Sequence, residues 1–562
     1  MRTLDCGGAA VTLAPMVVLD GEQLDDDTPG VTTATGTTST GDADILTVRW
    51  PGRARCRLTI RRSAPGRYLV AVDVIAERAG LLDAGGVRLR RQDSASRLLV
   101  DGFHSWDWAG VRDTGTAGVD WWGGLWGATG EPERTVAVSP LTGEVLALVR
   151  PGDGSLELRY VAAPDQALGR SGQPRPLGWR LGAGATAALG TLRIGAPHPH
   201  RAAGLPWIDR VTVTESGWAP RGWLSWNCVG ATVTWDNVLE AARDLVPPDG
   251  VVLLDDGWMR RWGEWVENER FDRGLAELAT AVAALDRRLG LWVAPLSVDV
   301  EADLARDRPE LLLRDQDGEA VVDRRPARPQ HVLDPRNADV RLLLHGLGQR
   351  LGRSGVAVLK ADFLYQGTLA GRPGGVAPLR RAVGALCDGF RSRAGDAGPV
   401  WACGAPAPAV VGVVDACRSG GDAVQRVPSL GVPPPGPPSF VTGDAVVRAQ
   451  ERNLAARSWL WGPQLVCDVD AVSAGTISDD APAVSDEVLD RWVRLVRRAG
   501  GPRLVSDRLE RLDEGRAAQL RALLTAPAAP RERPVDPLAM AASNDDDFLA
   551  WQDGLPEEWA PV

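Results

Sequence analysis

Histidines, paired cysteines and long apolar runs are all scarce in this chain, and each shortage argues against a kind of protein. The 562 residues include five histidines and no His-x-x-x-His pair, so a histidine metal site or a Ser-His-Asp triad has little to draw on. The seven cysteines form no Cys-x-x-Cys pair, which argues against a disulfide framework and a zinc ribbon. No apolar run reaches the about 18–20 residues that span a bilayer, and the first residues do not resemble a signal peptide. We therefore expect no membrane partner and a cytoplasmic location.

Lysine is the scarcest residue of all. Among 63 basic residues Lys360 is the single lysine. The net charge is −10 and the arginines are scattered rather than gathered in a stripe, so we expect no nucleic-acid partner. The chain is 44% hydrophobic and 24% charged, as soluble globular proteins are, and its length predicts two or three domains. The sequence leaves the oligomeric state open.

Residues 1–205 predict an N-terminal all-β domain. Short runs rich in β-branched residues are separated by Gly, Pro and Asp, and no helical period of useful length interrupts them. These runs lie at 44–50, 56–63, 67–75, 135–150 and 155–162. The pattern is typical of a β-sandwich.

After Pro206 the pattern changes to apolar runs that alternate with amphipathic helices. The strand candidates are 221–227, 249–258, 289–295, 356–363, 399–406, 410–422, 456–470 and 502–512, and the helix candidates include 234–245, 271–290, 339–352, 378–395 and 487–500. Gly290 is expected to end the second of these helices. Strands that are apolar on both faces suit a parallel sheet covered by helices.

The predicted fold class is therefore multidomain, β plus α/β, with a β-sandwich followed by a (β/α)8 TIM barrel over 206–525. An open, doubly wound sheet is the alternative, but no Gly-rich phosphate loop follows the first strand. The proline-rich segment 427–440 predicts an extended loop between the sixth and seventh strands. Residues 526–562 are rich in Pro and Asp and predict a C-terminal tail.

Functional groups in such a barrel gather where the strands end and the following loops begin. Carboxylates and tryptophans dominate these positions, whereas serine nucleophiles and phosphate loops are absent from them. The residues are Trp226, Asn227, Asp255, Asp256, Trp258, Trp292, Pro295, Lys360, Asp362, Cys403, Asp415, Arg418, Asp422, Asp468 and Asp470. This composition favours acid–base chemistry on a sugar.

Lys360 and Asp362 stand two residues apart on a predicted strand, so their side chains point to the same side, which is inward in a barrel. The ammonium group should keep Asp362 ionised and nucleophilic. An ordinary buried ion pair is the alternative. Against it, arginine makes the stronger ion pairs, and this chain uses arginine at every other basic position.

Two other pairs of charged residues also have alternative interpretations. Asp255 and Asp256 are adjacent, so they share a site only where their strand ends; otherwise one of them caps a turn or helix. Arg418 and Asp422 flank a glycine-rich segment, where a carboxylate can approach a ligand closely. A solvated loop aspartate is the alternative for Asp422.

Tryptophan is abundant, with 22 residues against three tyrosines and six phenylalanines. A group of tryptophans crowds into a stretch rich in Gly and Asp, which is loop composition. Its members are Trp106, Trp108, Trp121, Trp122 and Trp126. These tryptophans could contact a ligand such as a sugar ring, could contact the neighbouring domain, or could serve plain packing, and the sequence leaves these alternatives open.

Seven motifs in sequence order resemble those of glycoside hydrolase family 36, the α-galactosidases and raffinose-synthase relatives. "GWLSWN" is similar to the family's first-strand motif, and "LLDDGW" followed by "GEWVENERFDRGL" to its Asp-Asp-Gly-Trp region. "GLWVAP", "LKADFLY", "CGAP", "GVVDACRSGGD" and "VCDVDAV" follow in the family's order. In the N-terminal domain, "DGFHSWDW" is similar to a further family motif.

The resemblance implies a retaining α-galactosidase. Asp362 would be the nucleophile that attacks C1, and Asp422 would protonate the leaving oxygen and then activate water, with the two carboxyls about 5–5.5 Å apart. The substrate would be an α-galactoside, either a small molecule or an oligosaccharide, and the reaction would need no cofactor and no metal. Implied substrate-binding residues are Asp255 and Asp256 for the 4- and 6-hydroxyls, Lys360 and Arg418 as donors to ring hydroxyls, and Cys403, Trp226, Trp258 and Trp292 as pocket walls.

The chain departs from the family pattern at several points, which bear on the choice of substrate and aglycone. The first-strand cysteine is displaced, because Leu224 precedes Ser225 and Cys228 follows Asn227. His104 stands where glutamine is usual, and the loop after the predicted acid/base lacks its usual aromatic residue. We also expect the family's C-terminal β-domain to be short or missing.

Other functions stay open beside hydrolysis. A transglycosylase of the raffinose-synthase type would use the same two carboxylates. A lysine at the end of a barrel strand could instead form a Schiff base, as in aldolase-type chemistry, and Lys360 is the candidate. A non-catalytic sugar-binding protein is disfavoured because both predicted catalytic carboxylates are present.

Overall fold

A computed structural model describes residues 1–527, except 7–8, 92–96, 101–108, 122–123, 128–134, 144, 163–174, 197–219, 316, 325–327, 370–375, 393–397, 423–424, 427–439, 442–443, 458–464, 476–482 and 509–510. The predicted boundary at 205–206, nearly all of the proline-rich segment and the tail from 528 onward lie outside the described residues. So do His104, Trp106, Trp108 and Trp122, and the side chains of Trp121 and Trp126.

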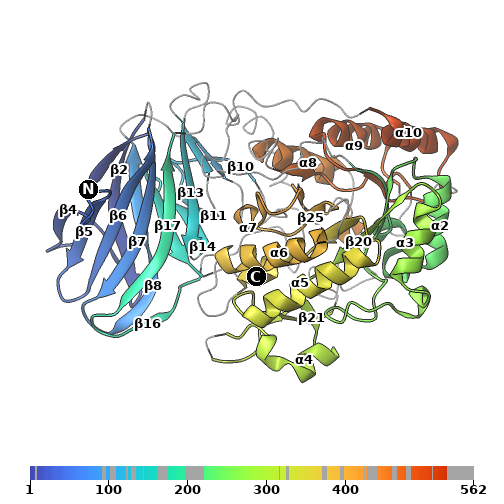
Figure 1. The fold of residues 1–562 in the computed structure, drawn as a ribbon. Helices are drawn as coiled ribbons and strands as arrows, with labels where there is room; N and C mark the ends of the chain where they lie inside the picture. The colour runs from blue at the N-terminus through green and yellow to red at the C-terminus, as the bar shows by residue number, and fades with distance from the viewer. Residues whose placement is uncertain are drawn as a thin grey trace.

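The N-terminal region consists of two antiparallel sheets (Figure 1, blue to cyan). The first has the order β1 (Arg2–Asp5), β2 (Ala10–Leu19), β8 (Gly80–Arg91), β15 (Leu156–Val161), β14 (Val145–Arg150) and β11 (Gly118–Trp121), with β3 (Glu22–Leu24) beside β2 and β16 (Trp179–Leu181) beside β8. The second has the order β10 (Gly110–Asp113), β9 (Arg97–Val100), β12 (Gly124–Gly127), β13 (Val136–Gly143), β17 (Thr186–Gly195), β7 (Arg67–Ala76), β6 (Ala54–Ala64), β5 (Asp44–Trp50) and β4 (Thr32–Thr37).

Alternating side chains explain why these two sheets share one core. In β6, Cys56, Leu58 and Ile60 are buried while the alternating residues Arg55, Arg57 and Arg61 are exposed, as the period of two requires. These residues belong to the same buried cluster as Leu13 and Val17 of β2 in the other sheet. The expected strands are present, and the segment predicted at 135–150 contains two of them, β13 and β14.

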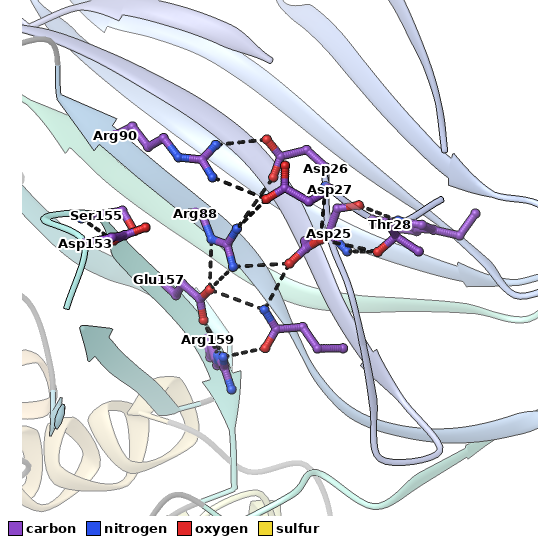
Figure 2. A network of polar contacts seen from close by, with 12 residues as sticks. Asp25, Asp26, Asp27, Thr28, Arg88, Arg90, Asp153, Ser155, Glu157 and Arg159 are labelled. Carbon is purple, nitrogen blue, oxygen red and sulfur yellow. Dashed lines mark hydrogen bonds and ion pairs between the residues drawn. The ribbon is translucent and has the colours of Figure 1, made fainter. Parts of the chain in front are cut away.

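A charged network ties the segment after β3 to β8 and β15 (Figure 2). Arg88 donates to the buried Glu157 at 2.5–2.9 Å and to Asp25 at 3.2 Å, while Arg90 donates to Asp26 at 2.9 Å. Carboxylate oxygens of three successive aspartates, 25–27, lie within 4.8 Å of one another. The two arginines offset part of the negative charge of this group, which links the segment after β3 to two neighbouring strands of the same sheet.

The second region is a curled, eight-stranded parallel sheet with the order β29 (Val466–Asp468), β26 (Ala416–Arg418), β25 (Val400–Ala402), β24 (Val358–Ala361), β20 (Arg288–Val293), β19 (Val251–Leu254), β18 (Arg221–Leu224) and β30 (Arg503–Val505). Each predicted strand segment overlaps one of these strands, and only β20 extends beyond its segment, by one residue. A parallel bridge between Val472, beyond β29, and Val505 of β30 links the two ends of the series. The strand order is the one expected of a (β/α)8 barrel.

Helices cover this sheet (Figure 1, green to red). They are α1 (Trp226–Val229), α2 (Trp235–Asp244), α3 (Leu275–Ala283), α4 (Asp303–Asp307), α5 (Ala338–Arg353), α6 (Val376–Arg391), α7 (Ala407–Val410), α8 (Asp444–Ala456), α9 (Asp486–Ala499) and α10 (Glu514–Thr525). Short 3-10 helices span Gly230–Thr232, Glu269–Phe271, Pro309–Leu311 and Leu364–Thr368. In α2 the first turn is fixed by a capping box between Thr234 and Asn237. Among the described residues, no helix is both long and apolar enough to cross a bilayer.

The predicted helix end at Gly290 is wrong. Helix α3 ends at Ala283, and Gly290 lies inside β20, paired with Leu253 and Val358 on the neighbouring strands. A Cβ atom at this position would come 2.7 Å from Cδ1 of Leu253. The glycine therefore permits close packing within the sheet. In the sequence alone, a glycine after an amphipathic segment resembles the end of a helix.

Two small sheets were not expected from the sequence. The first has the order β21 (Ser297–Asp299), β23 (Gln330–Val332) and β22 (Val322–Asp323), and it follows β20. The second pairs β27 (Gln425–Arg426) with β28 (Phe440–Val441) around the proline-rich segment. These strands are two or three residues long, too short to carry a recognisable period.

The N-terminal β region packs against the loops that follow β24 and β25. Ala84, Ala147 and Val161 of the N-terminal β region form one buried cluster with Tyr365 and Cys403 of the parallel-sheet region. Polar contacts add to this interface: Asn453 Oδ1 of α8 accepts from the amide of Ala109 at 3.1 Å, and Arg452 donates to the Ala109 carbonyl at 3.2 Å. The N-terminal β region thus adjoins the edge where the parallel strands end.

Candidate active site

Asp255 and Asp256 lie in the turn that ends β19, which is the condition for both carboxylates to share a site. The amide of Asp255 donates to Oγ of Ser225 at 2.9 Å, and the amide of Asp256 donates to Oδ1 of Asp255 at 2.9 Å. Gly257 continues the turn with a φ of 116°, and a Cβ there would come 2.7 Å from the backbone of Ala231. The turn therefore requires glycine.

Lys360 is the last residue but one of β24, and its ammonium group lies between two carboxylates. Its Nζ is 2.8 Å from Oδ2 of Asp255 and 3.8 Å from Oδ2 of Asp362. Burial lowers the pKa of Lys360, but the charges of Asp255 and Asp362 outweigh burial and raise it overall. The lysine is therefore a fixed cation whose closest partner is Asp255.

Asp362 follows β24 and is held by two donors besides the lysine. Nε1 of Trp292 donates to its Oδ2 at 3.0 Å, and the amide of Phe363 donates to its Oδ1 at 2.7 Å. Phe363 has a φ of 54°, an uncommon conformation for a bulky residue. Backbone strain next to a buried, multiply held carboxylate is typical of functional sites.

Arg418 ends β26 and spreads its guanidinium over three carboxylates. Nε donates to Asp468 at 2.6 Å, Nη1 to Asp422 at 2.9 Å and Nη2 to Asp470 at 2.8 Å. Asp468 and Asp470 are buried, and Asp470 has a φ of 72°. The arrangement fixes Arg418 from two sides and leaves Asp422 as its outermost partner.

Asp422 differs from the other carboxylates because its side chain is 48% exposed. The protein around this half-exposed carboxyl partly excludes water and raises the pKa of Asp422 to about 6; the charge of Arg418 opposes this shift, and those of Asp470 and Asp362 add to it. A carboxyl group with such a pKa can hold a proton near neutral pH and release it again, as a general acid and base must.

The predicted wall residues lie at different depths. Trp226 begins α1 and is 40% exposed, whereas Trp292 and Cys403 are buried. Trp258 is fully buried and donates from Nε1 to the carbonyl of Trp292 at 2.9 Å, so it supports Trp292 from behind. Burial raises the pKa of the Cys403 thiol well above its usual range, with a further contribution from Asp362.

One predicted strand-end residue is at the wrong end. Asp415 precedes β26 and accepts hydrogen bonds from Arg391 at 2.6 Å and from the amide of Val400 at 2.8 Å. These contacts join α6 to the start of β25, so Asp415 stabilises the opposite edge of the sheet. The structure also adds Trp262 and Phe363 to the site, and nothing in the local sequence pattern singles out either residue.

Comparisons with known proteins agree with this geometry. The Melibiase family model matches residues 225–369, which include Asp255, Lys360 and Asp362. The bifunctional α-galactosidase/sucrose kinase AgaSK of Mediterraneibacter gnavus is 29% identical over 126 residues, 21% of this chain. The α-galactosidase AgaA of Geobacillus stearothermophilus is 37% identical over 101 residues, 16% of this chain. In both cases the match spans 13% of the relative's length.

Solved structures extend the likeness to the whole fold. The α-galactosidase TtGalA of Thermus thermophilus, in complex with p-nitrophenyl α-D-galactopyranoside, has a TM-score of 0.60 and 22% identity, and the match covers 88% of this chain and 95% of that one. The family 36 α-galactosidase AgaA, in complex with raffinose, has a TM-score of 0.55 and 14% identity, with 92% and 77% covered.

The fold is thus similar to that of the matched α-galactosidases, with an antiparallel β region that precedes a curled parallel sheet. Residues 225–369 match the Melibiase family model, and the resemblance of the chain to glycoside hydrolase family 36 is confirmed.

Proposed function

We propose that the protein is a retaining α-galactosidase that hydrolyses terminal α-galactosyl residues by double displacement. The observation that carries the proposal is that Asp362 and Asp422 lie in different environments. Asp362 is buried beside the Lys360 cation and accepts two hydrogen bonds, whereas the half-exposed Asp422 has a pKa raised to about 6. Environments that separate two carboxyls in this way assign one as nucleophile and the other as acid/base.

In the proposed mechanism Asp362 attacks C1 of the galactosyl group while Asp422 protonates the departing oxygen. Asp422 then removes a proton from water, which displaces Asp362 and restores the starting configuration at C1. Asp255, Asp256, Lys360 and Arg418 would hold the sugar hydroxyls, and Cys403, Trp226, Trp258 and Trp292 would form the pocket walls. The mechanism needs no cofactor and no metal.

The same proposal includes the domain plan: a β-sandwich over 1–205, a closed (β/α)8 barrel over 206–525 and a tail over 526–562. The strand order of the parallel sheet and the bridge between Val472 and Val505 support closure. Complexes of the structural relatives with stachyose, raffinose and p-nitrophenyl α-D-galactopyranoside support an α-galactoside, including an oligosaccharide, as the substrate.

The electrostatics of Lys360 count against Schiff-base chemistry at this position. A lysine that attacks a carbonyl must lose its proton, which requires a lowered pKa. The net pKa of Lys360 is raised, because Asp255 and Asp362 stabilise its charged form. Trapping with borohydride and a carbonyl substrate should therefore leave Lys360 unmodified.

The test of the function is hydrolysis of p-nitrophenyl α-D-galactopyranoside, with the first anomer of galactose identified by NMR. Retention and a galactosyl adduct on the peptide containing Asp362, trapped with a 2-fluoro galactosyl donor, are the expected results. Asp507→Asn is a matched control, because Asp507 is equally buried and accepts from the amides of Ala474 and Gly475. Inversion, or turnover that survives in Asp362→Asn, would overturn the mechanism. Reactions with sucrose added separate hydrolysis from transglycosylation.

A further inference from the structure

Trp262 lies in the segment after β19 and reaches back to the carboxylate pair. Its Nε1 donates to Oδ1 of Asp256 at 3.0 Å, and its side chain is only partly buried. The segment around it is fixed from outside the sheet: the Trp262 carbonyl accepts from the amide of Asp299 in β21 at 3.0 Å. Gly263, with a φ of 94°, would bring a Cβ 3.0 Å from Val298. The indole is therefore held in place by the small sheet that follows β20.

The same indole packs on both groups that hold Asp362. Its ring centroid is 5.1 Å from that of Trp292, which donates to Oδ2 of Asp362. It is 5.2 Å from the ring of Phe363, whose amide donates to Oδ1 of Asp362. These tilted contacts are ordinary stabilising aromatic geometries. Trp262 is thus in contact with Asp256 and with the supports of Asp362.

The charges around Asp256 show what this hydrogen bond does. Burial raises the pKa of Asp256 to about 6, and the charge of Asp255 adds to the increase; the bond from Trp262 and the charge of Arg328 lower it. Arg328 stands before β23 and Asp255 ends β19, so these charges face Asp256 from two elements. The indole N–H favours the ionised carboxylate, which is the form that accepts a hydrogen bond from a hydroxyl group.

We propose that Trp262 is a positioning residue that orients Asp256 toward a substrate hydroxyl remote from the reacting carbon. The inference rests on the proposed function, because it assumes that Asp362 lies below C1 of a bound sugar. Asp255 is linked to Asp362 through Lys360, whereas Asp256 accepts a side-chain hydrogen bond from Trp262. Trp262 would therefore act on sugar binding more than on bond cleavage.

Trp262→Phe tests the inference, because it removes the N–H and keeps an aromatic ring against Trp292 and Phe363. The dissociation constant of galactose, from calorimetry, and the KM of p-nitrophenyl α-D-galactopyranoside should each rise about tenfold, as expected for a lost hydrogen bond to a charged group. The kcat should change less than about threefold, which is the signature of a lost binding contact. The pH below which galactose binding weakens should move upward, because Asp256 loses a group that lowers its pKa.

Trp492→Phe is the matched control. Trp492 is fully buried in α9, and among the described residues its indole N–H has no hydrogen-bond partner. This variant should leave galactose binding and its pH dependence unchanged. If Trp262→Phe behaves like Trp492→Phe, or loses kcat as strongly as it raises KM, Trp262 does not act through Asp256 and the inference is wrong.

A double-mutant cycle makes the test independent of how well any one variant folds. If Trp262 acts through Asp256, Trp262→Phe added to Asp256→Asn should weaken galactose binding by less than about twofold further. Losses that multiply would overturn the inference. A wild-type protein that hydrolyses no α-galactoside would instead overturn the proposed function, so the two failures are distinguishable.

Discussion

Replacing Asp470 with asparagine should shift the pH dependence of the proposed reaction in a known direction. Asp470 accepts from Nη2 of Arg418, and its charge raises the pKa of Asp422. Asparagine has the same shape, tolerates the φ of 72° at this position and keeps an oxygen for Arg418 and for the amide of Ala471. The variant therefore removes one negative charge with little change in geometry.

The size of the shift follows from the geometry of Arg418. Asp422 and Asp470 bind its two terminal nitrogens at 2.9 and 2.8 Å, and because a guanidinium is a rigid fork the carboxylates lie about 6 Å apart. Two unit charges at that distance interact by about 3 kcal/mol at an effective dielectric constant of about 20, or about two pKa units. The Asp422 side chain is 48% exposed, so solvent screening reduces the expected shift to about one unit.

The assay is the pH profile of kcat/KM for p-nitrophenyl α-D-galactopyranoside. In the wild type, activity should fall as pH rises through about 6, because Asp422 then loses the proton that the leaving group needs. In Asp470→Asn the pKa of Asp422 is lower, so this limb should move about one unit toward acid. Asp507→Asn, which removes a buried carboxylate with separate partners, should leave the limb in place. An unmoved limb in Asp470→Asn, or one displaced toward alkaline pH, would refute the reasoning.

Other variants test the site and the fold. Asp362→Asn should reduce kcat by at least about 10⁴-fold, in assays of aryl galactoside hydrolysis, while circular dichroism stays that of the wild type. Lys360→Arg should weaken galactose binding by more than about tenfold, since the wider guanidinium does not fit where an ammonium lies 2.8 Å from Asp255; normal binding in calorimetry would contradict this. Gly222→Ala should lower the free energy of unfolding by about 3 kcal/mol or more, because its Cβ would come 1.8 Å from a backbone carbonyl of the next strand. Gly346→Ala, in open space on α5, should instead be neutral or stabilising in the same denaturant titration.

The parallel sheet could be predicted from the sequence because its signals repeat. Each strand is a short apolar run, and each is followed by a residue type that suits the functional edge. Lys360 and Asp362 lie on the same side of β24 because the side-chain period of a strand is two, and the structure puts their charged atoms 3.8 Å apart. Over β24, the family resemblance and the strand periodicity both predict that Lys360 and Asp362 face the same side.

Errors arose where one residue type serves two roles. Gly290 resembles a helix stop, but it is a close-packing residue inside β20. Asp415 resembles a functional carboxylate, but it binds Arg391 at the start of β26. In both cases the predicted boundary of the strand or helix was wrong, because such boundaries depend on tertiary contacts.

The contacts of Trp262 could not be predicted for a different reason. They depend on β21, three residues long, which fixes the segment from outside the sheet. The sequence predicts Asp468 and Asp470 as strand-end carboxylates. It does not predict that both bind Arg418, because this contact requires β26 and β29 to be neighbours in the sheet. A local sequence pattern does not predict which strands pair when they are separated by about 50 residues.

The two central cations show why this chain keeps one lysine among its arginines. At Arg418 three carboxylates approach from separate directions, and a planar fork supplies one donor to each through Nε, Nη1 and Nη2. At Lys360 two carboxylates converge on a single point, one from the end of β19 and one from the end of its own strand, β24, in a space where the lysine side chain is 7% exposed. A compact ammonium pairs with both and keeps a further N–H donor for a substrate hydroxyl, whereas a guanidinium would have to displace one of the carboxylates. The arrangement of the carboxylates therefore determines whether arginine or lysine fits. The position that requires lysine, Lys360, lies beside the proposed nucleophile Asp362.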